Sequence, residues 1–244
     1  MKIRNLKSGR RRNLIIICFL LFTLLSIVLF WKLSHKDQKI WSWTMGSRIV
    51  VIDAGHGGVD PGAVSKTKVL EKDITLAVSK ILKNYVQQGG GKAIMVREDD
   101  RDLGTSEGLL KRKREDLAQR LQLALDSQAD LYLSIHVNSY PNEKLTGPQV
   151  FYYSDSPESK ILAQSIQKSL NEIVNGKRVA KGNKELFILK KARQASVTIE
   201  LGFLSNQVEE ELLQDSQYQQ KMAWAIYRGL CEYFDKVGVS MSKE

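Results

Sequence analysis

The 244-residue sequence predicts an α/β domain of three layers, with a mostly parallel central sheet and helices on both faces. Two observations lead to this fold class. Short runs rich in β-branched residues alternate with segments of ten or more residues whose apolar positions recur at helical spacing. The first short run, Ile49–Ile52, is continuously apolar, which is typical of a strand buried on both faces and hence of a parallel sheet.

The predicted elements follow in a regular order along the chain. After the first strand, apolar residues recur at helical spacing from Leu70 to Val86, and Gly89–Gly91 ends that helix. The other predicted strands are Ala93–Val96, Leu131–Ile135, Gln149–Tyr153, a short one at Phe187–Leu189, and Ser196–Ile199. The other predicted helices are Lys111–Ser127, Ser159–Val174 and Gln217–Phe234.

A segment of another kind precedes this domain. Residues 1–13 are basic, and residues 14–31 form an uncharged apolar run that would be about 27 Å long as a helix. The run is longer than the apolar part of most signal peptides, and no small-residue cleavage motif follows it. We therefore expect an uncleaved transmembrane signal anchor, with a cleaved signal peptide as the alternative. The basic residues before the run place the N-terminus in the cytoplasm and the rest of the chain outside.

The predicted organisation is a basic cytoplasmic segment (1–13), a transmembrane anchor (14–31), a polar tether (32–47), a globular domain (48–237) and a tail (238–244). The net charge of +10 arises almost entirely before the domain. Beyond residue 48, basic and acidic residues nearly balance, so the charge indicates membrane topology and argues against a nucleic-acid partner.

The residues suited to catalysis gather where the predicted strands end. His56 follows the first strand, His136 follows the strand at Leu131–Ile135, and Glu200 follows the last strand. The carboxyl ends of parallel strands meet at one edge of a sheet, and the helix that carries Glu71 also starts there. Two imidazoles and one carboxylate suit a catalytic zinc ion that keeps one position open for water.

The second carboxylate could then take the proton of the activated water. Residue types alone leave two assignments open: Glu71 as ligand with Glu200 as base, or the reverse. No H-E-x-x-H or G-x-S-x-G motif occurs, and two cysteines are too few for a thiolate zinc site. The basic run Lys111–Arg114 is offset at once by acidic residues, which predicts a solvated helix start.

Four motifs, spread in order over residues 48–236, resemble those of the zinc-dependent N-acetylmuramoyl-L-alanine amidases. They are Val51–Gly58 with Pro61–Ala63, Glu71–Asp73, Ser134–Ser139 and Glu200–Asn206. The resemblance implies one zinc ion per domain. It implies that His56, Glu71 and His136 are the metal ligands and that Glu200 is the catalytic base. The implied reaction is hydrolysis of the amide between N-acetylmuramic acid and L-alanine of the peptidoglycan stem peptide.

Within that family, the chain is most similar to the germination-specific amidases of spore formers. The similarity lies in Arg101–Leu103, in Lys111–Leu117 and in a lone domain behind an anchor. It implies a role in spore cortex maturation, through muramic-δ-lactam formation, in the space between forespore and mother cell. The alternatives are a vegetative autolysin of the same family, another zinc amide hydrolase, and a catalytically weak wall-binding protein. The expected partners are peptidoglycan, the membrane and an accessory activator protein.

Overall fold

The computed structural model describes residue 13 and residues 16–26 and 45–241. The predicted anchor at 14–31 and tether at 32–47 lie partly outside the described residues, so both remain predictions. Within the described part of the chain, no helix has the length and apolar character needed to cross a membrane. The chain divides into two compact units, residues 1–42 and 43–244, and all the elements below belong to the second.

This second unit is built on a six-stranded sheet in the order β2-β1-β3-β6-β4-β5. The strands are β1 (Ile49–Ala54), β2 (Lys92–Met95), β3 (Leu131–Asn138), β4 (Gln149–Tyr153), β5 (Lys181–Asn183) and β6 (Ala195–Phe203). The first four strands of that order are mutually parallel, whereas β4 pairs antiparallel with β6 and β5 runs parallel to β4. The predicted α/β class is confirmed, and the sheet is mixed because one edge is reversed.

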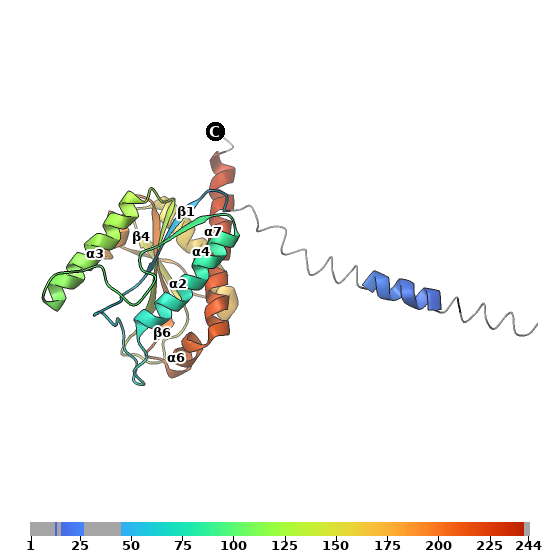
Figure 1. Cartoon of the computed structure of the whole chain (residues 1–244), viewed down its shortest axis with the longest axis horizontal. Helices are drawn as coiled ribbons and strands as arrows, with labels where there is room; N and C mark the ends of the chain where they lie inside the picture. Colours follow the sequence, from blue (N-terminus) through green and yellow to red (C-terminus); the bar gives the residue numbers. More distant parts are fainter. Residues whose placement is uncertain (1–12, 14–15, 27–44, 242–244) are drawn as a thin grey trace, which may run out of the picture. The chain divides into compact units, whose positions relative to one another are not determined.

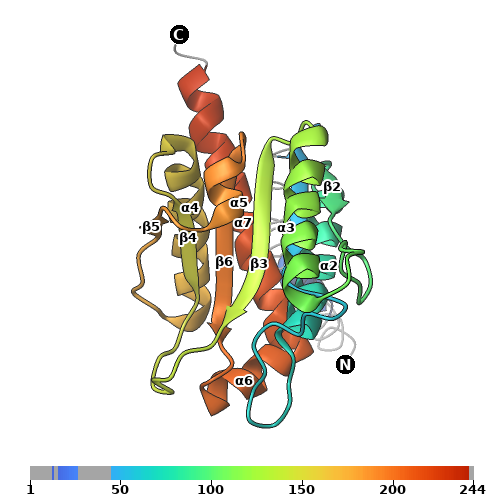
Figure 2. The same cartoon turned by 90° about the vertical axis from the view of Figure 1, so that its left-hand side faces the viewer.

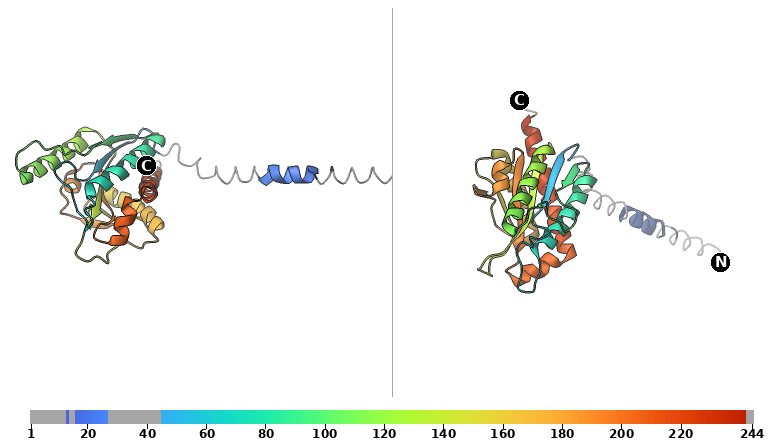
Figure 3. Two further views of the ribbon diagram at one scale, coloured as in Figure 1. Left: turned by 60° about the horizontal axis from the view of Figure 1, so that its bottom comes forward. Right: turned by 60° about the vertical axis from the view of Figure 1, so that its left-hand side comes forward.

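Helices cover both faces of the sheet (Figure 1). The helices are α2 (Glu71–Gln88), α3 (Leu109–Asp126), α4 (Pro157–Val174), α5 (Phe187–Lys191), α6 (Gln207–Gln214) and α7 (Ser216–Met241). α2 and α4 pack on α7 and on one face, whereas α3 and α5 pack on the other face. Figure 2 shows α3 and α5 in front of the sheet with α7 behind it, and Figure 3 shows α3 and α7 on opposite sides.

The local sequence explains why these helices form where they do. In α2, Ile74, Val78, Leu82 and Val86 are spaced four residues apart and are all buried, so one side of the helix faces the core. Its first residue, Glu71, is acidic and lies at the positive end of the helix dipole. The predicted period thus places the start of α2 at the edge where the parallel strands end.

The prediction of a strand at Phe187–Leu189 is wrong, because these residues begin α5. Ile188 packs from α5 against Val51 and Tyr132 on the sheet. A run of three apolar residues has no measurable period, so it cannot distinguish a strand from one helical turn. The pattern also misses β5, a three-residue polar edge strand, and α6, which begins at the side-chain cap of Asn206.

Candidate active site

His56 lies just beyond β1 in an unusual backbone conformation. Its φ is 63°, in the left-handed region that few residues with a side chain adopt. The ring contacts a carboxylate on each side. Nδ1 lies 2.9 Å from Asp60 Oδ2, and Nε2 lies 3.2 Å from Glu71 Oε2. Because a carboxylate at Nδ1 holds the proton there, Asp60 orients the ring so that Nε2 faces the other site residues.

Glu71 is the first residue of α2, and its buried carboxylate joins the two histidines. Oε1 lies 2.9 Å from His136 Nδ1 and accepts a hydrogen bond from the backbone N–H of Val137. Oε2 accepts from the backbone N–H of Ala63 at 2.7 Å. Only 4% of the residue is exposed, so these contacts fix the carboxylate at the ends of β1 and β3.

His136 and Glu200 are direct neighbours across the parallel pair of β3 and β6. Residues opposite each other on neighbouring strands project from the same face, so this register brings the two side chains together. Both residues were expected at the ends of strands, but they lie inside them, because the ladder continues to Asn138 and Phe203 through an irregularity after His136. Glu200 Oε2 is buried and has no hydrogen-bond partner among the described residues.

The donor set of His56, Glu71 and His136 fits a metal ion. Each residue offers one ligand atom, and these three atoms all lie within 4.8 Å of one another. Two imidazoles and one carboxylate, with a position left for water, form a donor set that catalytic zinc uses. Glu200 is not part of this set but is the nearest neighbour of His136 on β6. The structure therefore brings all four predicted residues to one place.

Two glycines make the close approach of these side chains feasible. A Cβ atom on Gly55 would lie 2.4 Å from Cε1 of His136, and one on Gly62 would lie 2.5 Å from Oε2 of Glu71. Gly62 also has a φ of +69°, which any side chain would strain. Both positions need glycine because the side chains of His136 and Glu71 occupy the space of a methyl group.

Charges within the cluster separate the two glutamates. Burial alone would raise the pKa of Glu71, but hydrogen bonds with His136 and His56 hold that pKa well below its ordinary value. Burial raises the pKa of Glu200 to about 7, against the opposing charge of His136. Burial would lower the pKa of His56, yet the hydrogen bonds with Asp60 and Glu71 raise it to about 9. An ionised Glu71 suits a ligand, whereas Glu200 has the basicity of a proton acceptor near neutral pH.

Two buried arginines, which sequence reasoning missed, hold the backbone that leads into His56. Arg120 pairs with buried Asp53 and donates to the carbonyl oxygens of Ala54 and His56, the latter at 2.7 Å. Arg97, two residues after β2, donates to the Ala54 carbonyl at 2.8 Å. Arg120 and Arg97 are 3% and 1% exposed. Charge patterns in the sequence show neither their burial nor their partners.

Asp60 was not among the predicted site residues, and the start of α3 differs in part from its prediction. Asp60 is a direct partner of His56, and its only signal in the sequence is a turn four residues after the histidine. The run Lys111–Arg114 was expected to be solvated. Lys111 and Arg114 are exposed as expected, but Arg112 pairs with Asp102, and Lys113 pairs with Asp60 at 2.7 Å. Half of this basic run therefore supports the loops around the site.

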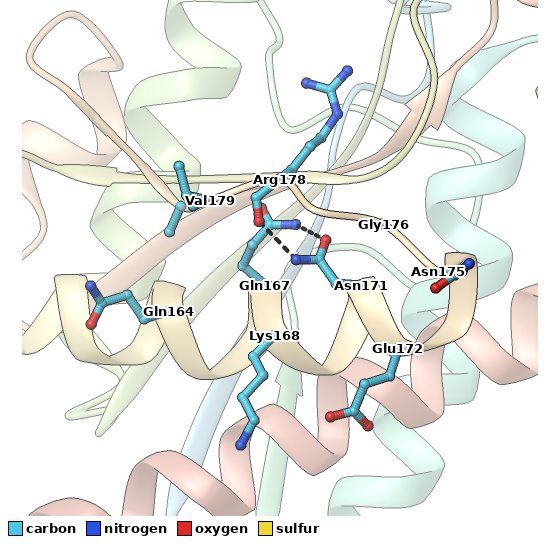
Figure 4. Close-up of a pocket in the computed structure, with 10 residues that line it drawn as sticks. Gln164, Gln167, Lys168, Asn171, Glu172, Asn175, Gly176, Arg178 and Val179 are labelled. Carbon is cyan, nitrogen blue, oxygen red and sulfur yellow. Dashed lines mark hydrogen bonds between the residues drawn. The ribbon is translucent and has the colours of Figure 1, made fainter.

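A separate cavity of ≈ 480 Å³ lies beside the end of α4 and contains none of the four predicted residues. Figure 4 shows two of its lining amides, Gln167 and Asn171, bonded to each other, with Asn171 also donating to the backbone of Arg178. Gln167 further bonds the backbone of Pro148 and Val150 at the start of β4. The amides are thus used internally to hold β4.

An α/β sheet with a His–Glu–His donor set and an adjacent free carboxylate is typical of metal-dependent hydrolases. Residues 50–232 match the family described as N-acetylmuramoyl-L-alanine amidase, and the chain belongs to that family. The protein is accordingly an amidase that acts on peptidoglycan.

Particular amidases are similar to this chain in sequence and in structure. The chain is 40% identical to the germination-specific N-acetylmuramoyl-L-alanine amidase of Bacillus subtilis (strain 168), over 93% of this chain and 98% of that protein. Among solved structures, it resembles the CwlD amidase of Clostridioides difficile, determined in complex with the GerS lipoprotein. That match has a TM-score of 0.76 and 39% identity, and covers 78% of this chain and 99% of that one. The catalytic domain of CwlV from Bacillus (Paenibacillus) polymyxa var. colistinus matches with a TM-score of 0.68 and 29% identity, over 77% and 98% of the two chains.

Proposed function

We propose that this amidase binds one zinc ion through His56, Glu71 and His136 and uses Glu200 as its catalytic base. The bond to be cleaved is the amide between N-acetylmuramic acid and L-alanine of the stem peptide. Two observations together carry the proposal. The three donor atoms lie within 4.8 Å of one another, and Glu200, whose Oε2 has no hydrogen-bond partner among the described residues, lies opposite His136 on the next strand. This arrangement favours Glu71 as ligand, because both of its oxygens already contact the histidines.

The residues divide the chemistry between them. Zinc, when bound, supplies a water of lowered pKa and a Lewis acid for the scissile carbonyl. Glu200 Oε2 has no other partner among the described residues, so it is free to take the water proton and return it to the leaving amine. Asp60 fixes the His56 ring, and Arg120 fixes the His56 backbone by donating to its carbonyl oxygen. The leaving amine becomes the new N-terminus of the stem peptide.

The largest expected effect is that of Glu200→Gln. Loss of a positioned base lowers turnover by about 10²- to 10⁴-fold, whereas zinc should remain bound because Glu200 is outside the donor set. We would measure zinc by elemental analysis and the release of L-alanine N-termini from purified peptidoglycan with its glycan left intact. His136→Ala should lose the zinc, and Glu107→Gln, an exposed carboxylate change, is the matched control. Full activity in Glu200→Gln would refute the assignment of the base.

The products released from peptidoglycan also distinguish the proposed amidase from proteins that catalyse another reaction or none. A peptidase would leave stem peptides attached to the glycan, a deacetylase would release acetate, and a catalytically weak wall-binding protein would release neither. Only an amidase frees the complete stem peptide.

We further propose a role in spore cortex maturation, supported by the similarity to the Bacillus subtilis germination-specific amidase. The site would act outside the cytoplasm, held to the membrane by residues 14–31, or exported if that segment is cleaved. The CwlD structure was determined with a lipoprotein, which supports an accessory partner for this chain too. Expression in Bacillus subtilis lacking its germination-specific amidase tests the role. Restored muramic-δ-lactam is the expected result, and wall lysis without it would favour a vegetative autolysin.

A further inference from the structure

α3 contacts the turn that carries His56 at two places. Lys113, Asp116 and Arg120 are spaced three and four residues apart, so they share one side of the helix. Arg120 donates to the carbonyl of His56, and within α3 it also pairs with Asp116 at 2.7 Å. Two turns of helix earlier, the ammonium group of Lys113 lies 2.7 Å from Asp60 Oδ1. The helix therefore meets both ends of the turn from His56 to Asp60.

The carboxylate of Asp60 connects Lys113 to the imidazole of His56. Its Oδ1 accepts from Lys113 and, at 3.2 Å, from the backbone N–H of Gly62, while Oδ2 faces His56 Nδ1 at 2.9 Å. With two donors on one oxygen, the carboxylate plane is fixed and the other oxygen is aimed at the ring. Side-chain exposure is 19% for Asp60 and 40% for Lys113, so the connection runs from the surface to the site.

We propose that Lys113 is a positioning residue that fixes the imidazole of His56 for metal binding through Asp60. This inference rests on the proposed zinc site. An exposed ion pair contributes little to stability, about 0–1 kcal/mol, so the significance of Lys113 lies in geometry. Without the ammonium group, Asp60 keeps only the weaker backbone contact and can rotate away from His56. The imidazole then loses the partner that selects its tautomer and orientation.

The test is a zinc titration of the full-length chain against a chelator. Lys113→Met should weaken zinc binding by about three- to tenfold, less than the 10- to 100-fold typical of a group bonded directly to a metal ligand. Lys113→Arg should recover affinity because it keeps a cation near Asp60. Lys111→Met, an exposed change two residues earlier on the same helix, is the control and should bind zinc like the wild type. The melting temperature of each metal-free variant monitors folding.

The connection itself is tested in an Asp60→Ala background, or Asp60→Asn if the first variant does not fold. There, Lys113→Met should change zinc affinity by less than about twofold, because the residue through which Lys113 acts is gone. An equal loss in both backgrounds would overturn the inference, as would a Lys113→Met affinity matching that of Lys111→Met. A wild-type chain that binds no zinc would instead refute the proposed function, and this result is visible before any variant is compared.

Discussion

The two helical layers that cover the sheet are built from different interactions. On one face, α2, α4 and α7 pack through fully buried apolar side chains such as Leu82, Ile166 and Leu230. On the other face, α3 fully buries only Arg120 and Ala124. Its partly buried leucines pack with Ile188 of α5 against a small apolar cluster on the sheet, and its charged side chains contact the His56 turn. Both layers therefore contribute apolar packing, but the layer with α3 also adds charges, one of them the buried Arg120, that contact the turn of one proposed metal ligand.

Replacing Arg120 by Met should have the largest effect of any change to the two layers, because it should lower both the stability of the fold and the affinity for zinc. The variant leaves Asp53 buried without its cation, and breaking one side of a buried ion pair costs about 3–5 kcal/mol of unfolding free energy. Zinc affinity should fall too, since the His56 carbonyl loses its donor. Urea unfolding and chelator competition measure the two effects. Adding Asp53→Asn should restore part of the stability without restoring zinc affinity. An unchanged urea midpoint in the single variant would contradict the prediction.

The matching change in the layer of α2, α4 and α7 is Leu82→Ala. A cavity in a packed core costs about 2–5 kcal/mol, and Leu82 is fully buried in α2. Zinc affinity and turnover per folded molecule should stay at wild-type values, because Leu82 lies about three turns after Glu71 on α2 and takes no part in the site's hydrogen bonds. Urea unfolding and zinc titration of the same preparation provide the check. A parallel loss of zinc affinity would show that the two layers are not separable in this way.

The smallest effect should appear in the metal-free protein as pH rises. The folded state keeps a proton on His56 up to a pKa of about 9, whereas the unfolded chain releases it near 6.5. This contribution to stability is complete below pH 6.5 and is lost as pH rises through 9. Melting temperatures in chelator between pH 6 and 9.5 should therefore fall, and Asp60→Asn should flatten the decline. Leu82→Ala should lower the whole curve without changing its slope, and a melting temperature that rises over this range would contradict the account.

Sequence reasoning reached the four central residues because strand ends and helix starts converge in any parallel sheet. It placed His136 and Glu200 beyond strands that in fact continue past them, since hydrogen-bond ladders have no sequence signal at their ends. It missed Arg97 and Arg120 because a charged side chain reads as exposed until its partners are known. Asp60 was missed for a similar reason: its contact with His56 depends on the turn between the two residues, which is known only from the folded chain.

The pairing of His136 with Glu200 has a consequence for the order in which the protein is made. The proposed ligands are all present once the first 136 residues have been synthesised, but the residue opposite His136 arrives 64 positions later. A chain that ends before residue 200 contains the three proposed ligands but not the proposed base, and the pairing of β6 with β3 brings that base beside His136. On the proposed mechanism, hydrolysis therefore requires the completed β3–β6 pair.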